Sequence, residues 1–178
     1  MPSIKEPYPL HVIDAAAEEV TAPARRVKRG EVPNDEAHTY DHVWVVIDTD
    51  VAVREGYWND VLQSAKVNKV KLAHSSPCIE SWFLFHFSPT TRADLVNRDA
   101  AKKAVQIELG EPYSTNRRTA EAAIPKLLKN WPEAVKNAMQ VRQYRQDACT
   151  NQPANPSTEI DLLVRALDDA ALEHNRKL

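Results

Sequence analysis

The sequence of 178 residues contains only three glycines, Gly30, Gly56 and Gly110, and no two of them lie close together. A phosphate-binding P-loop and a dinucleotide-binding fingerprint both need clustered glycines, because the backbone must approach the phosphates closely. The chain therefore carries neither motif. If nucleotide hydrolysis belongs to its function, we expect a partner protein to supply it.

Cysteines and long hydrophobic runs are also scarce. Cys78 and Cys149 are far apart, which excludes zinc-type spacing and a disulfide framework and favours a reducing compartment. The longest apolar runs, residues 43–47 and 82–85, are too short to cross a bilayer, and the N-terminal residues have no signal-peptide core. We expect a soluble, cytoplasmic protein that makes no membrane contact.

A strong excess of one charge is missing too, since the formal net charge is −2. The charges are unevenly distributed, however. Residues 92–145 carry eleven Lys and Arg against six Asp and Glu, whereas residues 1–91 carry nine against thirteen. A basic middle segment suits a phosphate-binding surface. Such charged runs are more often solvated helix faces, and both interpretations stay open.

The pattern of apolar residues predicts a mixed α/β protein. We expect strands at residues 10–13, 43–47 and 69–74, with helices at 14–29 (interrupted by Pro23), 57–65 and 78–87. Short strands that alternate with helices predict a parallel sheet with helical crossovers. From residue 91 onward we expect helices only, over residues 92–109, 119–130, 132–147 and 157–175. This length suits a single domain over 1–178, with an α/β core at 1–90 and a helical extension at 91–178.

The run Val43–Ile47 ends on Asp48-Thr49-Asp50. Its unbroken apolar character predicts a strand covered on both faces. Side chains two residues apart in an extended segment point the same way, and ligands of α/β proteins bind at the carboxyl ends of strands. Asp48 and Asp50 could therefore bind a hard cation such as Mg²⁺. Alternatively, they end the strand and cap the next helix.

A second segment begins at Ser75-Ser76-Pro77, which is a favourable helix start, and continues as an almost wholly apolar helix. Such a helix is expected to be buried. Glu80, in its first turn, either gains from the helix dipole or faces the two aspartates as a further acid or metal ligand. His86 lies on another face and is predicted to be a hydrogen-bonded core histidine.

Several further side chains are candidates for binding phosphate. His74 lies at the end of the strand that we expect beside the aspartate strand. Lys102, Lys103, Arg117 and Arg118 belong to the basic middle segment, and each is a weak candidate by itself.

Three motifs occur in an order that resembles the RloB-like family. They are the strand ending in Asp48-Thr49-Asp50, the segment Ser75-Ser76-Pro77-Cys78-Ile79-Glu80-Ser81-Trp82 with a later His86-Phe87, and Asn155-Pro156-Ser157-Thr158 near the end. The middle segment is the specific one. The family's pattern has Asn where this chain has Ser76 and Phe where it has Ile79. The resemblance covers roughly residues 8 to 170.

This resemblance implies a Toprim-like Rossmannoid parallel sheet flanked by helices, followed by a helical C-terminal half. Toprim-like sites use an early glutamate together with an Asp-x-Asp pair to hold Mg²⁺ for phosphodiester chemistry. The resemblance therefore implies a Mg²⁺-dependent nuclease in which Asp48 and Asp50 bind the metal ion and are catalytic, and Glu80 is a further candidate for a catalytic residue. It also implies a role in phage defence by restriction or abortive infection, with an AAA or ABC-like ATPase as partner and DNA or RNA as substrate.

The family's early Glu-Gly-x-x-Thr-Glu segment has no counterpart in this sequence, since Glu6, Glu18 and Glu19 stand in other contexts. The chain opens almost directly at the expected second strand, so we expect truncation, a start placed too late, or a degenerate site. Two functions stay open: a nuclease, or a catalytically inactive protein that regulates its ATPase. A more remote third is a metal-dependent phosphohydrolase acting on nucleotides.

Overall fold

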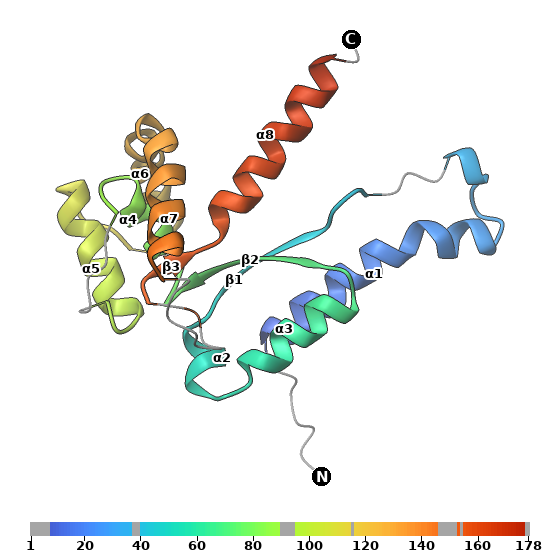
Figure 1. Cartoon of the computed structure of the whole chain (residues 1–178), viewed down its shortest axis with the longest axis horizontal. Coiled ribbons are helices and arrows are strands. Elements are labelled where there is room, and N and C mark those ends of the chain that lie inside the picture. The colour runs from blue at the N-terminus through green and yellow to red at the C-terminus, as the bar shows by residue number, and fades with distance from the viewer. Residues whose placement is uncertain are drawn as a thin grey trace. The chain divides into compact units, whose positions relative to one another are not determined.

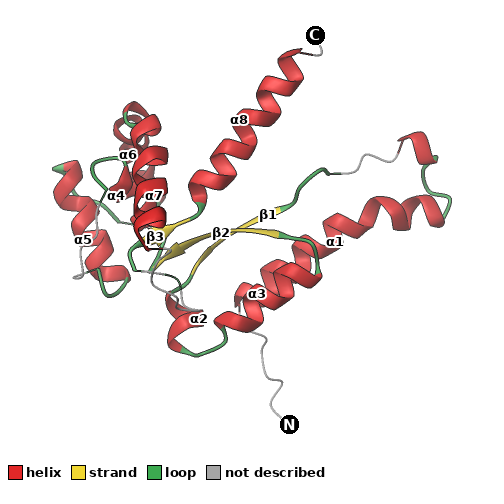
Figure 2. Ribbon diagram, in the orientation of Figure 1, coloured by secondary structure: helices red, strands yellow, loops and turns green. Residues whose placement is uncertain are grey.

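A computed structural model describes residues 8–36, 40–89, 95–114, 116–145, 153 and 155–176. Within these residues the chain forms eight α-helices, a short 3-10 helix and a three-stranded sheet (Figure 2). The elements are α1 (Tyr8–Lys28), η1 (Asn34–Glu36), β1 (Trp44–Asp48), α2 (Asp50–Arg54), α3 (Trp58–Val67), β2 (Lys71–Ser76), α4 (Glu80–Phe85), α5 (Arg98–Leu109), α6 (Arg117–Lys129), α7 (Trp131–Arg145), β3 (Ser157–Thr158) and α8 (Ile160–Arg176). Mixed α/β character is thus confirmed.

The chain divides into two compact units. The first comprises Met1–Val45 and Ala52–Leu72, and the second comprises Val46–Val51 and Ala73–Leu178. In the first unit α1 packs along α3 (Figure 1), with Ile13 and Val61 fully buried. None of the described helices is both long enough and apolar enough to cross a membrane.

The strand predicted at residues 10–13 is wrong, because these residues belong to α1. Pro9 and Ile13 are the buried residues of this helix, four positions apart, and the helix continues through Pro23. Alanine-rich sequence follows Ile13, so the helical period of the whole segment prevails over the local β-branched pair.

The sheet has the order β1-β2-β3 and is mixed. β1 runs parallel to β2, since Lys71 N–H donates to Val43 O (2.9 Å) at one end and Thr49 N–H donates to Ser75 O (3.0 Å) at the other. β3 pairs antiparallel with β2, with Ser75 opposite Thr158. The parallel β1–β2 pair was predicted from the sequence, but β3 was not, because two residues give no periodic signal. The larger parallel sheet of a Toprim-like fold is not seen in the described residues.

β1 alternates between buried and exposed side chains. Val45 and Ile47 are buried, whereas Val46 is 51% exposed. The prediction that this strand is covered on both faces is therefore wrong. An apolar run does not distinguish a doubly covered strand from an edge strand whose outer face also carries valine.

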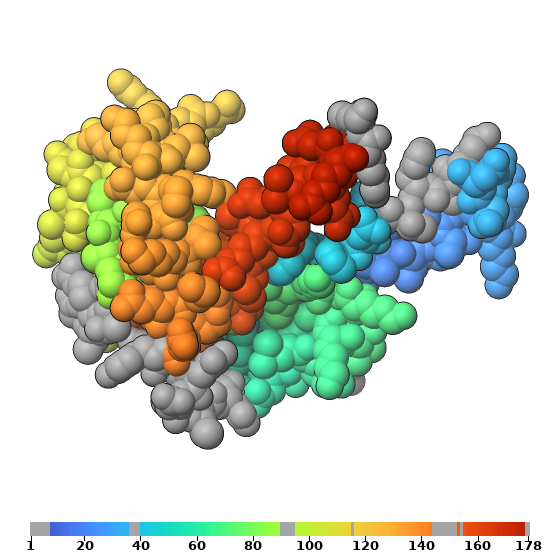
Figure 3. Space-filling model, turned by 45° about the horizontal axis from the view of Figure 1, so that its top comes forward, coloured from blue at the N-terminus to red at the C-terminus, as the bar shows by residue number. Residues whose placement is uncertain are grey.

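The second unit has a helical core. The prediction of helices only from residue 91 onward is wrong in one place, because Ser157–Thr158 form β3, which pairs with β2. α4 packs against α5 and α7, and a hydrophobic cluster forms around Cys78, Leu84, Val105 and Leu127. Proline usually disturbs a helix interior, but Pro125 lies inside α6. The first turns of α8 are buried and contact α7, whereas the rest of this helix extends away from the other helices of the unit (red in Figure 3).

Candidate active site

Asp48 and Asp50 lie on either side of a tight connection between β1 and α2. Asp48 is the last residue of β1, and Asp50 is the first residue of α2. Thr49 N–H donates to Ser75 O (3.0 Å), and Asp50 N–H donates to Pro77 O (3.1 Å). The aspartate segment is thereby fixed against the end of the parallel strand β2. This is the edge of a parallel pair at which α/β proteins place ligands.

Each aspartate uses one carboxylate oxygen to accept a backbone N–H. Ile79 N–H donates to Asp48 Oδ1 (2.8 Å), and Val51 N–H donates to Asp50 Oδ1 (2.8 Å). Asp48 ends the strand and Asp50 accepts an N–H at the start of the next helix, as the alternative predicted, whereas the N–H that Asp48 accepts belongs to the segment before α4. The second oxygen of each carboxylate, Oδ2, accepts no backbone N–H, and both Oδ2 atoms lie near the same side chain, that of Arg98.

The start of the helix predicted at Ser76 and Pro77 is three residues too early. α4 begins at Glu80, and its N-cap residue Ile79 has no side-chain cap hydrogen bond. The N–H of Ile79 instead finds its acceptor in Asp48. The carboxylate of Asp48, 31 residues away in the sequence, therefore takes the place of the predicted serine cap. The residues next to the helix start do not indicate this contact.

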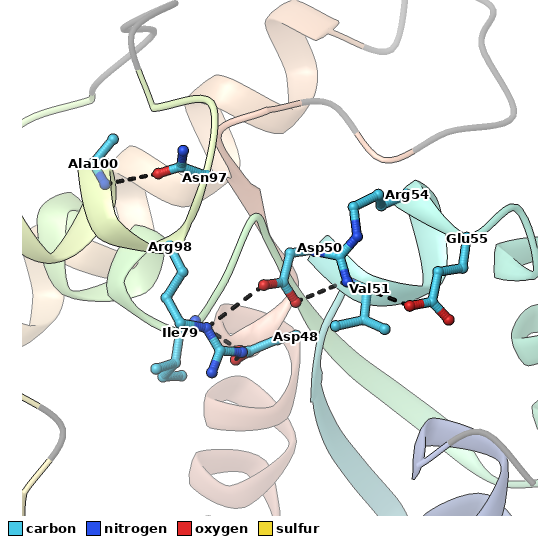
Figure 4. Close-up of polar contacts among 9 residues, drawn as sticks. All are labelled: Asp48, Asp50, Val51, Arg54, Glu55, Ile79, Asn97, Arg98 and Ala100. Carbon is cyan, nitrogen blue, oxygen red and sulfur yellow. Dashed lines mark hydrogen bonds and ion pairs between the residues drawn. The ribbon is translucent and has the colours of Figure 1, made fainter. Parts of the chain in front are cut away.

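Arg98 faces both aspartates. Its Nη2 lies 2.7 Å from Asp48 Oδ2, and its Nε lies 3.5 Å from Asp50 Oδ2 (Figure 4). Arg98 is the first residue of α5, and the preceding Asn97 caps this helix by accepting the Ala100 N–H at 3.0 Å. Two carboxylates therefore converge on one cationic group.

Sequence reasoning missed Arg98. It belongs to the basic middle segment but to none of the recognised motifs, and its contact with Asp48 spans 50 residues. The only available signal was the capping asparagine, which places Arg98 in the first turn of a helix. No local pattern says where that turn lies relative to β1.

The pKa values of Asp48 and Arg98 are set by burial together with the neighbouring charges. Burial raises the pKa of Asp48 above its ordinary value, and the nearby carboxylates of Glu80 and Asp50 add to the rise. The guanidinium of Arg98 and the N–H of Ile79 lower the pKa of Asp48, but they do not cancel the effect of burial. Burial lowers the pKa of Arg98, yet Asp50 and Asp48 outweigh it and hold this pKa above its usual range.

Glu80, the first residue of α4, is buried. Its side chain is 1% exposed and accepts a hydrogen bond from the Tyr113 hydroxyl at 3.3 Å. The pKa values of Cys78 and Tyr113 are raised, first by burial and then by the charge and hydrogen bonding of Glu80. Glu80 is thus close enough to influence Asp48, but it lies away from solvent. Its predicted role as an acid or metal ligand stays a prediction.

The other residues of the buried segment are core, as predicted. Trp82 and Phe85 are buried, and His86 is buried with Nδ1 3.0 Å from Trp82 O. His74 lies in β2, beside β1 as expected, and its Nδ1 is 3.0 Å from Glu159 Oε2. It is therefore paired with a carboxylate.

The four basic candidates lie on two helices. Lys102 and Lys103 are on α5, and Arg117 and Arg118 open α6. Arg117 is 90% exposed and pairs with Glu121 at 2.7 Å. Arg98, rather than any of these four, makes the ion pairs with the aspartates.

The two carboxylates of Asp48 and Asp50 fit a Mg²⁺ site in which the protein supplies only part of the ligands. The described residues include no group of three or more His, Cys, Asp and Glu that could hold a metal ion. Mg²⁺ is, however, usually bound through one or two carboxylates, with water and substrate phosphates completing its shell. Asp48 and Asp50 could serve in that way if their Oδ2 atoms were released by Arg98.

The comparison with protein families covers almost the whole chain. A family model described as RloB-like protein matches residues 3–167. No match was found among curated proteins or among solved structures. The matched span includes Asp48, Asp50, Glu80 and Arg98, together with most of both units of the fold. The chain therefore belongs to the RloB-like family.

Proposed function

We propose that this RloB-like protein is a Mg²⁺-dependent nuclease of the Toprim type, which acts in phage defence together with a partner ATPase. The observation that carries the proposal is the convergence of the Oδ2 atoms of Asp48 and Asp50 on one cationic group, at the carboxyl end of a parallel strand. Two carboxylates directed at one point are what a hard divalent cation requires.

In this proposal the acidic side chains bind the metal ion and the basic side chains bind the substrate. Asp48 and Asp50 would hold the cation with the carboxylate oxygens that are not bonded to backbone N–H groups, while the N–H groups of Ile79 and Val51 orient the two carboxylates through Oδ1. Mg²⁺ held there would lower the pKa of a bound water and neutralise charge on the phosphate. Glu80 is buried, accepts a hydrogen bond from Tyr113 and acts on Asp48 through its charge, which raises the pKa of Asp48. The basic residues of α5 and α6 attract the nucleic-acid backbone.

Cleavage of single-stranded DNA, duplex DNA and RNA with Mg²⁺ tests the proposal. We expect Asp48→Asn and Asp50→Asn to reduce the rate by about 100-fold or more, because metal-ion catalysis contributes several kcal/mol of transition-state stabilisation. Asp168→Asn, at an exposed aspartate of α8, is the matched control and should cleave like the wild type. Circular dichroism establishes that each variant is folded. Cleavage that is unchanged in Asp48→Asn contradicts the proposal.

The hydrogen bonds and ion pairs of the two aspartates favour a second candidate function, that of a non-catalytic regulator of the ATPase. Both Oδ1 atoms accept backbone N–H groups and both Oδ2 atoms are paired with Arg98, so each carboxylate oxygen has a partner without a metal ion. This candidate predicts that wild type and Asp48→Asn change the partner's ATP hydrolysis equally, with no Mg²⁺-dependent cleavage in either case.

A further inference from the structure

Arg98 holds the position that a divalent cation would need. Its guanidinium reaches the Oδ2 atoms of both Asp48 and Asp50, the two oxygens that are not engaged by backbone N–H groups (Figure 4). Mg²⁺ binds carboxylate oxygens at about 2.1 Å, so it cannot approach these atoms while the guanidinium lies against them. Repulsion between the two cations acts in the same direction.

The side chain of Arg98 is 43% exposed and belongs to the first turn of α5, which Asn97 caps by accepting the Ala100 N–H. The carboxylates, by contrast, are anchored through Oδ1. Exchange of cations at this site therefore needs rotation of one long side chain and no change in the backbone.

We propose that Arg98 is a built-in counter-ion of the Asp48–Asp50 pair, which a divalent cation displaces and which then binds a phosphate of the substrate. This inference rests on the proposed function. A displaced guanidinium beside the site is suited to bidentate binding of a phosphate. Because phosphate gives Arg98 a new partner, cation and nucleic acid bind cooperatively, and each raises the affinity for the other by the same factor.

The test measures Mn²⁺ binding, by electron paramagnetic resonance, with and without a short non-cleavable oligonucleotide. In Arg98→Gln without oligonucleotide, we expect the dissociation constant for Mn²⁺ to fall by about tenfold, the change that corresponds to 1.4 kcal/mol. The factor by which the oligonucleotide tightens Mn²⁺ binding should be smaller in Arg98→Gln than in the wild type. Arg98→Lys keeps the charge but not the forked geometry, so its dissociation constant should lie between the two.

Arg165→Gln is the matched control, because Arg165 is an exposed arginine of α8 that contacts the sulfur of Met139. Its Mn²⁺ affinity should equal that of the wild type. Mn²⁺ affinity that is unchanged or weaker in Arg98→Gln, or tightened equally in Arg165→Gln, overturns the proposal for Arg98. Mn²⁺ binding that is unchanged in Asp48→Asn counts instead against the proposed function, so the two failures are distinguishable.

Discussion

At the scale of single residues, the buried segment Cys78–Phe87 illustrates how burial sets the chemistry of a side chain. Glu80 and His86 are both polar and almost fully buried, and each has a hydrogen-bond partner. The pKa of His86 is lowered, because burial disfavours the imidazolium form. His86 therefore remains neutral under conditions in which an exposed histidine becomes protonated.

This lowered pKa makes stability depend on pH. Above the ordinary value of 6.5, His86 is neutral in both the folded and the unfolded chain and contributes no pH dependence. As the pH falls through that value, the unfolded chain binds a proton that the folded chain does not, so the free energy of unfolding decreases by up to about 1.4 kcal/mol per pH unit. His86→Gln removes this contribution.

Urea unfolding at about pH 7.5 and about pH 5.5 provides the measurement, on either side of the ordinary histidine pKa. The loss of stability between the two pH values should be smaller in His86→Gln than in the wild type. His174→Gln, at an exposed histidine of α8, should behave like the wild type. An identical loss in wild type and His86→Gln would show that His86 takes up its proton without unfolding.

At the scale of elements, the start of α8 is fixed by a buried ion pair. Arg142 of α7 donates through Nη1 to Asp161 Oδ1 (2.9 Å) and through Nη2 to Asp161 Oδ2, and Asp161 is fully buried. Thr158 of β3 adds a cap, since its Oγ1 accepts the Ile160 N–H at 3.2 Å. The sequence predicted a helix over residues 157–175. The helix is confirmed, but it begins at Ile160, because Ser157 and Thr158 form β3.

Removal of Arg142 should therefore be costly. Arg142→Met leaves the Asp161 carboxylate buried without its counter-ion, and we expect a destabilisation of about 3 kcal/mol or more. Lys136→Met breaks the exposed pair between Lys136 and Glu133 of the same helix, and it should cost less than about 1 kcal/mol. Denaturant unfolding of the two variants compares them directly. Equal effects would mean that the buried pair contributes no more than a surface pair.

Elements with a long periodic pattern could be predicted, and elements defined by pairing could not. The helices from α5 to α8, the strand β1 and the buried helix α4 were all expected from sequence. β3 consists of two residues whose extended form depends on Ser75 and Ser76 opposite them. The N-terminal Val12-Ile13 pair favours a strand locally, but the residues around it form one helix that packs on α3.

At the scale of the whole molecule, charge is separated along the chain. The net charge is only −2, yet residues 92–145 have an excess of basic residues, and α5 and α6 carry the candidates for phosphate contact. If these helices bind a nucleic-acid backbone, binding must release counter-ions and weaken as salt is added.

Salt dependence of nucleic-acid binding tests this surface. Replacing Lys103, Arg117 and Arg118 by alanine together should weaken binding to every sequence and reduce the slope of log affinity against log salt by about 1 for each lost phosphate contact. Lys66→Ala removes an exposed lysine from α3, in the acidic part of the sequence, and should leave the slope unchanged. A slope that is the same in the triple variant and the wild type would assign these residues to solvated helix faces.

The sequence by itself determined the absence of a phosphate loop, a strand that ends in two aspartates, a buried helix after it, and membership of the RloB-like family. These depend on composition, short-range periodicity and motif order. Only the tertiary structure decided that Arg98 faces both aspartates, that Asp48 caps the segment before α4, and that Glu80 is buried. The contacts of Asp48 with Ile79 and Arg98 span 31 and 50 residues, and that of Ser75 with Thr158 spans 83. Side chains so far apart are brought together by the packing of whole elements, which no local pattern encodes.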